Sequence, residues 1–256
     1  LGNMQNLIPY ADDVLLNLNT CAMIFFGGIG FPVILEAARG RLRWHKMSMH
    51  ARAAILTSAV LLVLGAVLLK FTEGFSWLKA VLFSFSTRTA GFSTAPLSSF
   101  TPAGLTVVMA LMFVGASPGS TGGGVKTTTL FALLQGLKSA ATNRSERAFH
   151  YSLPKDAFRK AATICAMSIL VIGTGTFLLL VFEKGLAISD AMFEMVSAFG
   201  TVGLSTGITP TLSTAGKLLS ILVMFIGRLG PMTVATLWYF SRGERIAYPE
   251  GNISIG

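Results

Sequence analysis

The amino-acid sequence predicts an all-α integral membrane protein built from repeated units of helix, re-entrant loop and helix. Composition, the spacing of uncharged stretches and an internal repeat lead to this fold class. Hydrophobic residues fill 52% of the 256 positions and charged residues only 12%, with a mean hydropathy of +0.67. Because soluble domains carry roughly 25% charged residues, most of this chain is expected to lie in lipid.

Long uncharged stretches indicate the number of membrane crossings. Each approaches the roughly 20 apolar residues that a helix needs to cross a bilayer, and only Arg228 interrupts the last one. The first stretch is too long and too late in the chain for a signal peptide. We therefore expect five crossings, in the stretches 14–35, 53–69, 100–125, 161–182 and 218–241.

The net charge of +9 is distributed in alternate loops. Basic clusters follow the first, third and fifth crossings, and such loops face the cytoplasm. The charge therefore indicates the topology of a multi-pass membrane protein with a cytoplasmic C-terminus, and it disfavours nucleic acid as a partner. The clusters are Arg39, Arg41, Arg43, Lys46 and Arg52; Lys138, Arg144, Arg147, Lys155, Arg159 and Lys160; and Arg242 and Arg245.

Few residues within the crossings carry reactive side chains. Cys21 and Cys165 both fall in apolar stretches, so they are interpreted as packing residues without a disulfide framework. No constellation of His, Asp and Cys falls inside a crossing. A membrane-embedded enzyme is therefore disfavoured, and no covalent cofactor is expected.

An internal repeat gives the architecture. The hexad T-A-G-F-S-T at 89–94 recurs 112 residues later as T-V-G-L-S-T at 201–206. The tetrad M-F-V-G at 112–115 recurs at the same offset as M-F-I-G, and a third copy, I-F-F-G, lies at 24–27. Self-similarity at one fixed period is typical of repeat architectures.

Each repeat has the same order of predicted elements. A helix towards the outside is followed by a short semi-apolar segment, the hexad and a returning helix. The short segment cannot span a bilayer, so it dips in and returns, which is possible only where protein or a water-filled cavity covers the backbone. The predicted elements are 51–70, 76–88 and 101–142 in one repeat, and 158–182, 189–200 and 212–241 in the next.

The hexads have the chemistry of a cation filter. Gly91 and Gly203 tolerate positive φ, so neighbouring carbonyls can turn to one axis and replace the hydration shell of an ion. A short helix ending there directs its negative end at the ion. The alternative is a glycine-rich turn between packed helices. The predicted cation ligands are the carbonyls of Thr89, Ala90, Gly91, Phe92 and Ser93, and of Thr201, Val202, Gly203, Leu204 and Ser205.

The stretch 114–124 interrupts an otherwise apolar helix. Pro118 removes a backbone donor, and five glycines each disfavour helix by about 1 kcal/mol, so an unwound loop is predicted below the filter. Its end resembles a phosphate-binding loop, but Val125 separates Gly124 from Lys126. ATP binding is therefore disfavoured, and Lys126 is expected to reach the cytoplasmic mouth.

Three charged residues lie within the predicted membrane region of the repeats. Arg228 follows Gly227, the repeat equivalent of Gly115, so it is expected level with residue 116, facing the same pathway; a packing role is the alternative. Intramembrane charges are functional candidates by default. Arg88 and Glu194 either brace the filter with a salt bridge or line a solvated vestibule.

Three motifs carry a family resemblance: S-T-R-T-A-G-F-S at 86–93, S-A-F-G-T-V-G-L-S at 197–205 and F-I-G-R-L-G-P at 225–231. With the tail I-S-I-G at 253–256, the sequence resembles the ion-translocating subunit of the Ktr/Trk/HKT potassium transporter superfamily, most closely its bacterial KtrB branch. The resemblance covers essentially the whole chain. It implies four M1–pore loop–M2 repeats around a pseudo-fourfold pore.

On that resemblance, residues 1–46 form the outer linker and inner helix of repeat two, 47–150 form repeat three, and 151–256 form repeat four with a short tail. Half of the filter then lies outside this sequence; a natural five-helix protein is the alternative. A secondary transporter with a broken-helix substrate site also stays open, although the two repeats run parallel.

The resemblance also implies function and partners. It implies gated potassium uptake, with Na⁺ as a possible second ion, by a homodimer regulated by a cytoplasmic nucleotide-binding ring of the KtrA type. The gate would be the interrupted segment, with a basic residue beside it. Its residues are Gly115, Ala116, Ser117, Pro118, Gly119, Ser120, Thr121, Gly122, Gly123, Gly124 and Arg228.

Overall fold

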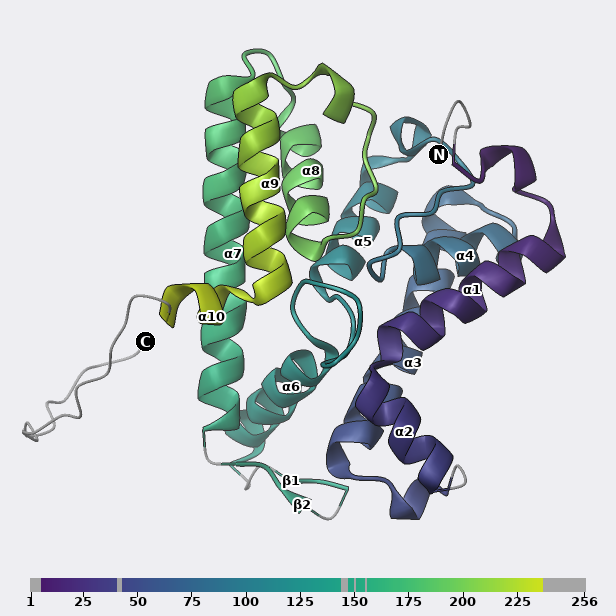
Figure 1. Cartoon of the computed structure of the whole chain (residues 1–256), viewed down its shortest axis with the longest axis vertical. Coiled ribbons are helices and arrows are strands. Elements are labelled where there is room, and N and C mark those ends of the chain that lie inside the picture. Colours follow the sequence, from purple (N-terminus) through teal and green to yellow (C-terminus); the bar gives the residue numbers. More distant parts are fainter. Residues whose placement is uncertain (1–5, 41–42, 144–146, 150, 155, 237–256) are drawn as a thin grey trace, which may run out of the picture.

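The computed structural model describes residues 6–40, 43–143, 147–149, 151–154 and 156–236. Across these ranges the regular structure is helical apart from one short antiparallel hairpin (Figure 1). The α-helices are α1 (Val14–Ile29), α2 (Phe31–Arg39), α3 (Met49–Glu73), α4 (Trp77–Ser86), α5 (Pro102–Phe113), α6 (Thr127–Thr142), α7 (Ala157–Phe182), α8 (Ile188–Gly200), α9 (Thr214–Leu229) and α10 (Pro231–Thr236). The hairpin pairs β1 (Arg147–Ala148) with β2 (Tyr151–Ser152), and 3-10 turns lie at Ile8–Tyr10, Trp44–Lys46, Leu97–Ser99 and Thr209–Thr211.

Helices α3 and α7 are long and apolar enough to cross a membrane as single helices. The side chain of Ser48 caps the first turn of α3 by accepting a hydrogen bond from Ala51 N, and Gly74 ends the helix in the left-handed conformation that favours glycine. Large apolar side chains such as Val63 and Phe177 are exposed on the outer faces of α3 and α7. This distribution fits helices whose outer faces contact lipid.

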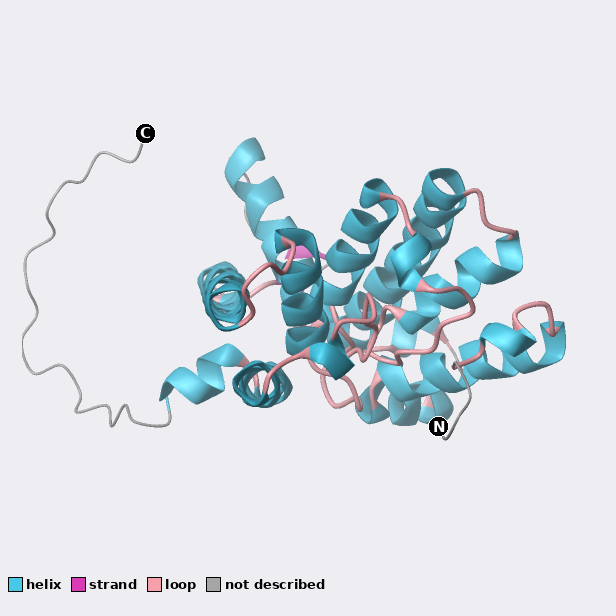
Figure 2. Ribbon diagram, turned by 90° about the horizontal axis from the view of Figure 1, so that it is seen from above, coloured by secondary structure: helices cyan, strands magenta, loops and turns pink. Residues whose placement is uncertain are grey.

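The predicted repeat is present in the structure. Helix α3 packs against α4 and α5, and α7 packs in the same way against α8 and α9. The two short predicted segments form α4 and α8, each ending at its hexad. Seen from above, loops gather in the middle of the molecule with helices around them (Figure 2). The all-α membrane fold with helix–re-entrant loop–helix units is confirmed.

The short helices are the most deeply buried part of the fold. Every residue of α8 from Phe193 to Gly200 is buried, and Phe83 of α4 is fully buried. The long helices α3 and α7 surround them with their inner faces and expose their outer ones. The core therefore forms around the elements that carry the hexads, which holds the hexads in fixed positions.

The inner helices differ from the prediction because two of them break at glycine. The crossing predicted at 14–35 was expected as one helix, but α1 and α2 meet at Gly30 with a bend of 95°. Helices α9 and α10 likewise separate at Gly230. The two glycines share one backbone conformation, with φ and ψ of 92° and 133° at Gly30 and 93° and 135° at Gly230, which residues with a Cβ rarely adopt. A proline follows each glycine within two residues and starts the next helix.

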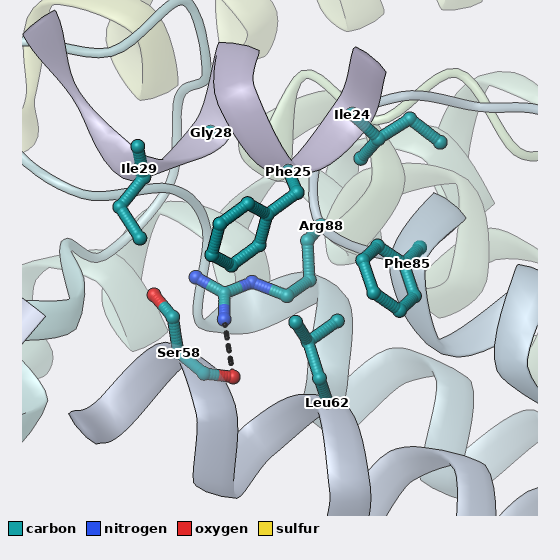
Figure 3. Close-up of a pocket in the computed structure, with 8 residues that line it drawn as sticks. All are labelled: Ile24, Phe25, Gly28, Ile29, Ser58, Leu62, Phe85 and Arg88. Atoms are coloured by element: carbon teal, nitrogen blue, oxygen red, sulfur yellow. Dashed lines mark hydrogen bonds between the residues drawn. The ribbon is translucent and has the colours of Figure 1, made fainter. Parts of the chain in front are cut away.

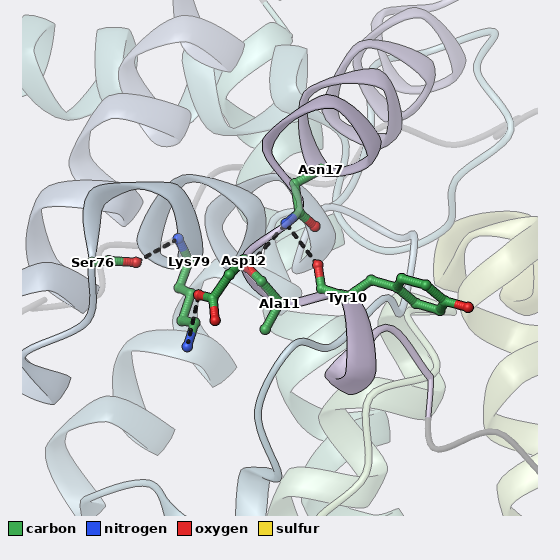
Figure 4. Close-up of polar contacts among 6 residues, drawn as sticks. All are labelled: Tyr10, Ala11, Asp12, Asn17, Ser76 and Lys79. Carbon is green, nitrogen blue, oxygen red and sulfur yellow. Dashed lines mark hydrogen bonds and ion pairs between the residues drawn. The ribbon is translucent and has the colours of Figure 1, made fainter.

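The end of the fifth predicted crossing, the C-terminal tail and its expected cytoplasmic position fall in residues 237–256, outside the described residues. At the other end of the described residues, the segment before α1 contacts repeat three. The side chain of Asn17 donates to the carbonyls of Tyr10 and Ala11, and Asp12 forms an exposed ion pair with Lys79 at 3.5 Å (Figure 4). This anchoring holds the segment before α1 close to α4.

Candidate ion pathway

The two hexads share an unusual backbone. Residues Thr89 and Gly91 have φ values of 69° and 76°, and their repeat equivalents Thr201 and Gly203 have 53° and 90°. Positive φ was expected at the glycines and is confirmed. At threonine, a β-branched residue, it is a rare conformation that costs on the order of 1–3 kcal/mol. The same strain at matched positions indicates that the surrounding fold imposes this backbone.

The hexads approach one another closely. A Cβ added to Gly91 would lie 2.4 Å from the carbonyl oxygen of Val202 and 3.4 Å from the Cα of Gly203. Glycine at 91 is therefore required by packing between the hexads as well as by its own φ. A Cβ at Gly203 would meet only the Cα of Gly91, at 4.0 Å, so only φ restricts that position.

Backbone amides of the hexads point back to the helices that precede them. The amides of Ala90 and Gly91 donate to Ser86 O at 3.1 and 3.3 Å, and Val202 N donates to Ser197 O at 3.0 Å. Among the described residues, the carbonyls of Ala90 and Val202 accept no hydrogen bond, whereas those of Gly91, Phe92 and Ser93 accept from Asn6 Nδ2, the Ser86 hydroxyl and Leu7 N. Because unpaired carbonyls need partners, those of Ala90 and Val202 are available to coordinate a cation.

The predicted interruption of the inner helix of repeat three is confirmed as a loop between α5 and α6. A parallel bridge between Val114 and Val125 closes its two ends. At its far end, Gly123 N donates to the hydroxyl of Thr201 at 3.0 Å, and the backbone of Gly122 is packed so tightly on Thr89 that a Cβ there would lie 2.1 Å from Thr89 Oγ1. The loop therefore contacts the first threonine of both hexads.

Neighbouring inner helices hold this loop through their repeat glycines. Thr121 N donates to Gly27 O at 3.2 Å, and Gly124 N donates to Gly227 O at 3.2 Å. These acceptors occupy the equivalent position in the inner helices on either side. The loop therefore spans from α1 to α9 beneath the hexads.

Two cationic side chains also hold the loop. Arg228 donates to the carbonyl of Thr121, so its expected reach to the interrupted segment is confirmed as a contact. Lys126 was expected to point to the cytoplasmic mouth, but its Nζ donates to Gly122 O at 2.6 Å. The correction has a physical cause, because the turn at Gly124 (φ 71°) folds the chain back and leaves carbonyls in reach of the ammonium.

Comparison with known proteins agrees with this geometry. A sequence model of the TrkH family, described as cation transport protein, matches residues 48–241. The chain belongs to the TrkH family. Since the family consists of transport proteins, the expectation that the chain is not an enzyme is confirmed.

Several curated relatives match nearly the whole chain. "Ktr system potassium uptake protein B" of Vibrio alginolyticus is 32% identical over 98% of this chain and 58% of its own length. "Ktr system potassium uptake protein D" of Bacillus subtilis is 34% identical over 98% and 59%. "Potassium/sodium uptake protein NtpJ" of Enterococcus hirae is 34% identical over 98% and 60%. The chain therefore spans less than two thirds of the length of these relatives.

A solved structure supports the fold. The potassium transporter TrkH from Vibrio parahaemolyticus superimposes with a TM-score of 0.70 at 22% sequence identity, covering 89% of this chain and 53% of that protein. At this identity the similarity concerns the fold alone, and it agrees with the helical repeats described above.

In this TrkH-family chain Arg88 and Glu194 do not form the expected salt bridge. The guanidinium of Arg88 donates to Ser58 O at 3.2 Å and Gly115 O at 3.1 Å. The carboxylate of Glu194 instead accepts from the hydroxyl of Ser205. The two side chains leave their helices in different directions, Arg88 towards α3 and the loop, and Glu194 towards the last part of its own hexad. Neither side chain lines a solvated vestibule, because Arg88 is 6% and Glu194 7% exposed.

The sequence analysis missed a pair of helix caps shared by the repeats. Glu73, at the end of α3, accepts from the amide of Thr101 at 3.0 Å, and Glu183, after α7, accepts from the amide of Ser213 at 2.7 Å. Hydrogen bonds from Ser213 hold the pKa of the Glu183 carboxyl below its usual value. The signal was present in the sequence as an acid near the end of each outer helix, about 30 residues before the cap of the next inner helix.

Proposed function

We propose that this TrkH-family chain forms part of a gated pathway for potassium uptake across a bacterial cytoplasmic membrane. The single observation that carries the proposal is the pair of touching hexads with matched positive φ, in which the carbonyls of Ala90 and Val202 accept no hydrogen bond among the described residues. The printed names of the relatives support potassium as the ion, and the name of NtpJ supports sodium as a second one.

The selectivity filter in this proposal consists of the carbonyls of 89–93 and 201–205. Two further hexads would complete a pseudo-fourfold ring, since repeats of this shape pack around an axis. Rings of carbonyls dehydrate an ion without a charged side chain, and neither hexad contains an acid. Selection by backbone dipoles is therefore the mechanism that fits these residues.

The gate in this proposal is the loop 115–124 with Arg228. The loop lies against both hexads through Gly122 and Gly123, in the path of an ion that has passed the filter. The glycines of the loop allow its backbone other conformations, and opening would break its hydrogen bonds to the hexads and to the neighbouring inner helices. The guanidinium of Arg228 stabilises the closed position by its bond to Thr121 O, and its charge repels a cation at the same level.

Regulation by a cytoplasmic nucleotide-binding ring of the KtrA type, acting on a homodimer, completes the proposal. It is supported by the word "system" in the names of the Ktr relatives and by the basic loops on one side of the membrane. In this arrangement the C-terminus faces the cytoplasm and the outer faces of α3 and α7 contact lipid.

The test is ⁸⁶Rb⁺ flux into liposomes that contain the full-length protein, with sodium as competitor. Deleting Gly119–Gly123 is expected to raise flux and reduce its dependence on the cytoplasmic regulator. Arg228→Gln is expected to raise flux as well, with Arg228→Lys intermediate because lysine keeps the charge but loses the planar fork of donors. A well-inserted deletion variant that conducts no faster than the parent would refute the gate.

A further inference from the structure

Arg88 is a buried cation that the proposed filter and gate leave unexplained. It directly precedes the first hexad and is 6% exposed. Among the described residues no carboxylate lies within ion-pair distance of it. A buried charge is costly unless it is hydrogen-bonded, and here the compensation comes from two backbone carbonyls, Ser58 O in α3 and Gly115 O at the start of the loop.

The repeat shows that this arrangement is specific to repeat three. The position equivalent to Arg88 is Gly200, where even a Cβ would lie 2.7 Å from the carbonyl of Met112. The acceptor Gly115 has the equivalent Gly227, whose carbonyl accepts from Gly124 N. An arginine therefore occurs in the repeat whose inner helix contains the loop, and glycine occurs in the repeat whose inner helix lacks it.

The contacts of Arg88 close a ring through the filter and the loop. Arg88 is joined by its peptide bond to Thr89, and Thr89 packs on Gly122 in the middle of the loop. The loop leads back along the chain to Gly115, whose carbonyl accepts from Arg88 at 3.1 Å. Any displacement of the loop at Gly115 must therefore break this bond or move the residue next to Thr89.

We propose that Arg88 is a positioning residue that couples the hexad of repeat three to the first hinge of the loop. The inference rests on the proposed function, because it assigns a latch to the same gate. With both carbonyls bound, the guanidinium holds the start of the loop against α3 and keeps Thr89 seated on Gly122. Release of Gly115 O frees the loop and loosens the first residue of the hexad together.

The surroundings of Arg88 supply a matched control. Figure 3 shows its guanidinium between Phe25 and Ser58, beside a cavity of about 20 Å³ that Ile24, Phe25, Gly28, Ile29, Ser58, Leu62, Phe85 and Arg88 line. Arg88 bonds the carbonyl of Ser58, whereas the Ser58 hydroxyl has no hydrogen-bond partner among the described residues. Ser58→Ala therefore changes the lining of the cavity and keeps the contact that the proposal needs.

The experiment is a four-corner cycle of ⁸⁶Rb⁺ flux in liposomes containing the full-length protein. Its corners are the parent protein, Arg88→Gln, the deletion of Gly119–Gly123, and both changes together. With the loop present, Arg88→Gln is expected to raise flux roughly fivefold to tenfold, since glutamine replaces the charged hydrogen bond to Gly115 O with a weaker neutral one. With the loop deleted, the same substitution is expected to change flux less than twofold.

Two further variants separate coupling from a general structural role. Arg88→Lys keeps one donor to Gly115 O or Ser58 O, so its rise in flux is expected to be at most half of the rise in Arg88→Gln. Ser58→Ala is expected to conduct like the parent. If Arg88→Gln does not insert into the membrane, Arg88→Lys goes through the same four corners, with a smaller rise expected that again disappears without the loop.

The outcomes distinguish this inference from the proposed function. An equal change of flux with and without the loop, a fall of flux in both backgrounds at equal amounts of inserted protein, or no change in either would overturn the coupling. If the loop deletion alone conducts no faster, the gate itself is refuted. If the deletion conducts faster but the Arg88 effect is the same in both backgrounds, the gate stands and only the latch is refuted.

Discussion

The hexads of repeats three and four have the same backbone but different supports. Both place a threonine and a glycine at positive φ, in the same order. Behind the first hexad lies the Arg88 guanidinium, directed to α3 and the loop, whereas the second is supported by the Glu194 carboxylate, directed to Ser205 and Thr209. The two repeats therefore share one hexad geometry and differ in what stabilises it.

The difference follows the position of the loop. At the places of Arg88 and Glu194, the other repeat carries Gly200 and Leu82, both buried. Repeat three directs its polar support inward to the interrupted helix, and repeat four directs its support outward to the linker after the hexad. The support of the first hexad is thereby connected to the proposed gate, and the support of the second to the linker that follows it. Variants at matched positions should separate these two roles.

The largest effect is expected at the glycines. Gly91→Ser should abolish selective flux, because its Cβ would lie 2.4 Å from Val202 O in addition to the cost of positive φ. Gly203→Ser has space for its Cβ and bears only the φ cost, about 1–2 kcal/mol. This variant should still conduct, but its preference for potassium over sodium should fall roughly tenfold. The measurement is ⁸⁶Rb⁺ flux in competition with sodium.

Membrane insertion of both glycine variants provides the control, since neither change affects a crossing helix. Equal selectivity losses at the two positions would show that contact between the hexads is unimportant. Unchanged selectivity in both would remove the backbone carbonyls as the origin of ion choice.

A smaller effect is expected at the threonines that the loop contacts. Thr201→Val preserves the shape but removes the acceptor for Gly123 N, at a cost of about 1 kcal/mol to the closed loop, or about fivefold faster flux. Thr89→Val is the matched variant, because the structure shows packing of Gly122 on Thr89 and no hydrogen bond from the loop to its hydroxyl. Faster flux in Thr89→Val than in Thr201→Val would contradict this role for the bond.

The outward support of repeat four gives the next comparison. Glu194→Leu installs the residue type that repeat three carries at Leu82, and leaves the Ser205 and Thr209 hydroxyls without their acceptor. We expect potassium preference to fall about threefold to fivefold, since each lost bond contributes about 1 kcal/mol and water replaces part of it. Glu194→Gln retains one acceptor oxygen and should lose less. An unaffected ion preference in the leucine variant would mean that Glu194 stabilises only the linker.

Much of this arrangement could be predicted from the sequence because it follows from local patterns. Apolar length predicted α3 and α7, the repeat offset predicted that α4 and α8 lead into the hexads, and Pro118 with its glycines predicted the interruption. The potassium ligands and the gate stay predictions.

Two kinds of feature could not be predicted from the sequence: the direction in which a side chain points, and backbone conformations that tertiary packing enforces. Thr89 and Thr201 adopt positive φ against the preference of their residue type. Gly30 bends its helix by 95°, although glycine within an apolar stretch is also compatible with a straight helix. The donors of Arg88 reach carbonyls 27 and 30 residues away. An arginine and a glutamate in two aligned motifs favour a salt bridge in the sequence, although the two side chains bind different partners in the structure.

The smallest expected effect is on thermal stability and concerns the glutamate caps that both repeats share. Its dependence on pH shows whether the charge or the shape of the glutamate side chain is responsible. Glu183 is half-buried, and bonds from Ser213 lower its pKa from the ordinary value of 4.5. A carboxyl with a lowered pKa in the folded state contributes stability above its ordinary pKa, and the contribution is lost as pH falls through the lowered value. Glu183→Gln should therefore lower Tm slightly at pH 7, with the difference from the parent disappearing well below pH 4.5, where both side chains are neutral. Thermal unfolding in detergent across this range measures it, with Glu183→Asp as a variant that keeps the charge on a shorter side chain. A Tm difference that is the same at pH 7 and at low pH would show that the shape of the side chain, and not its charge, caps α9.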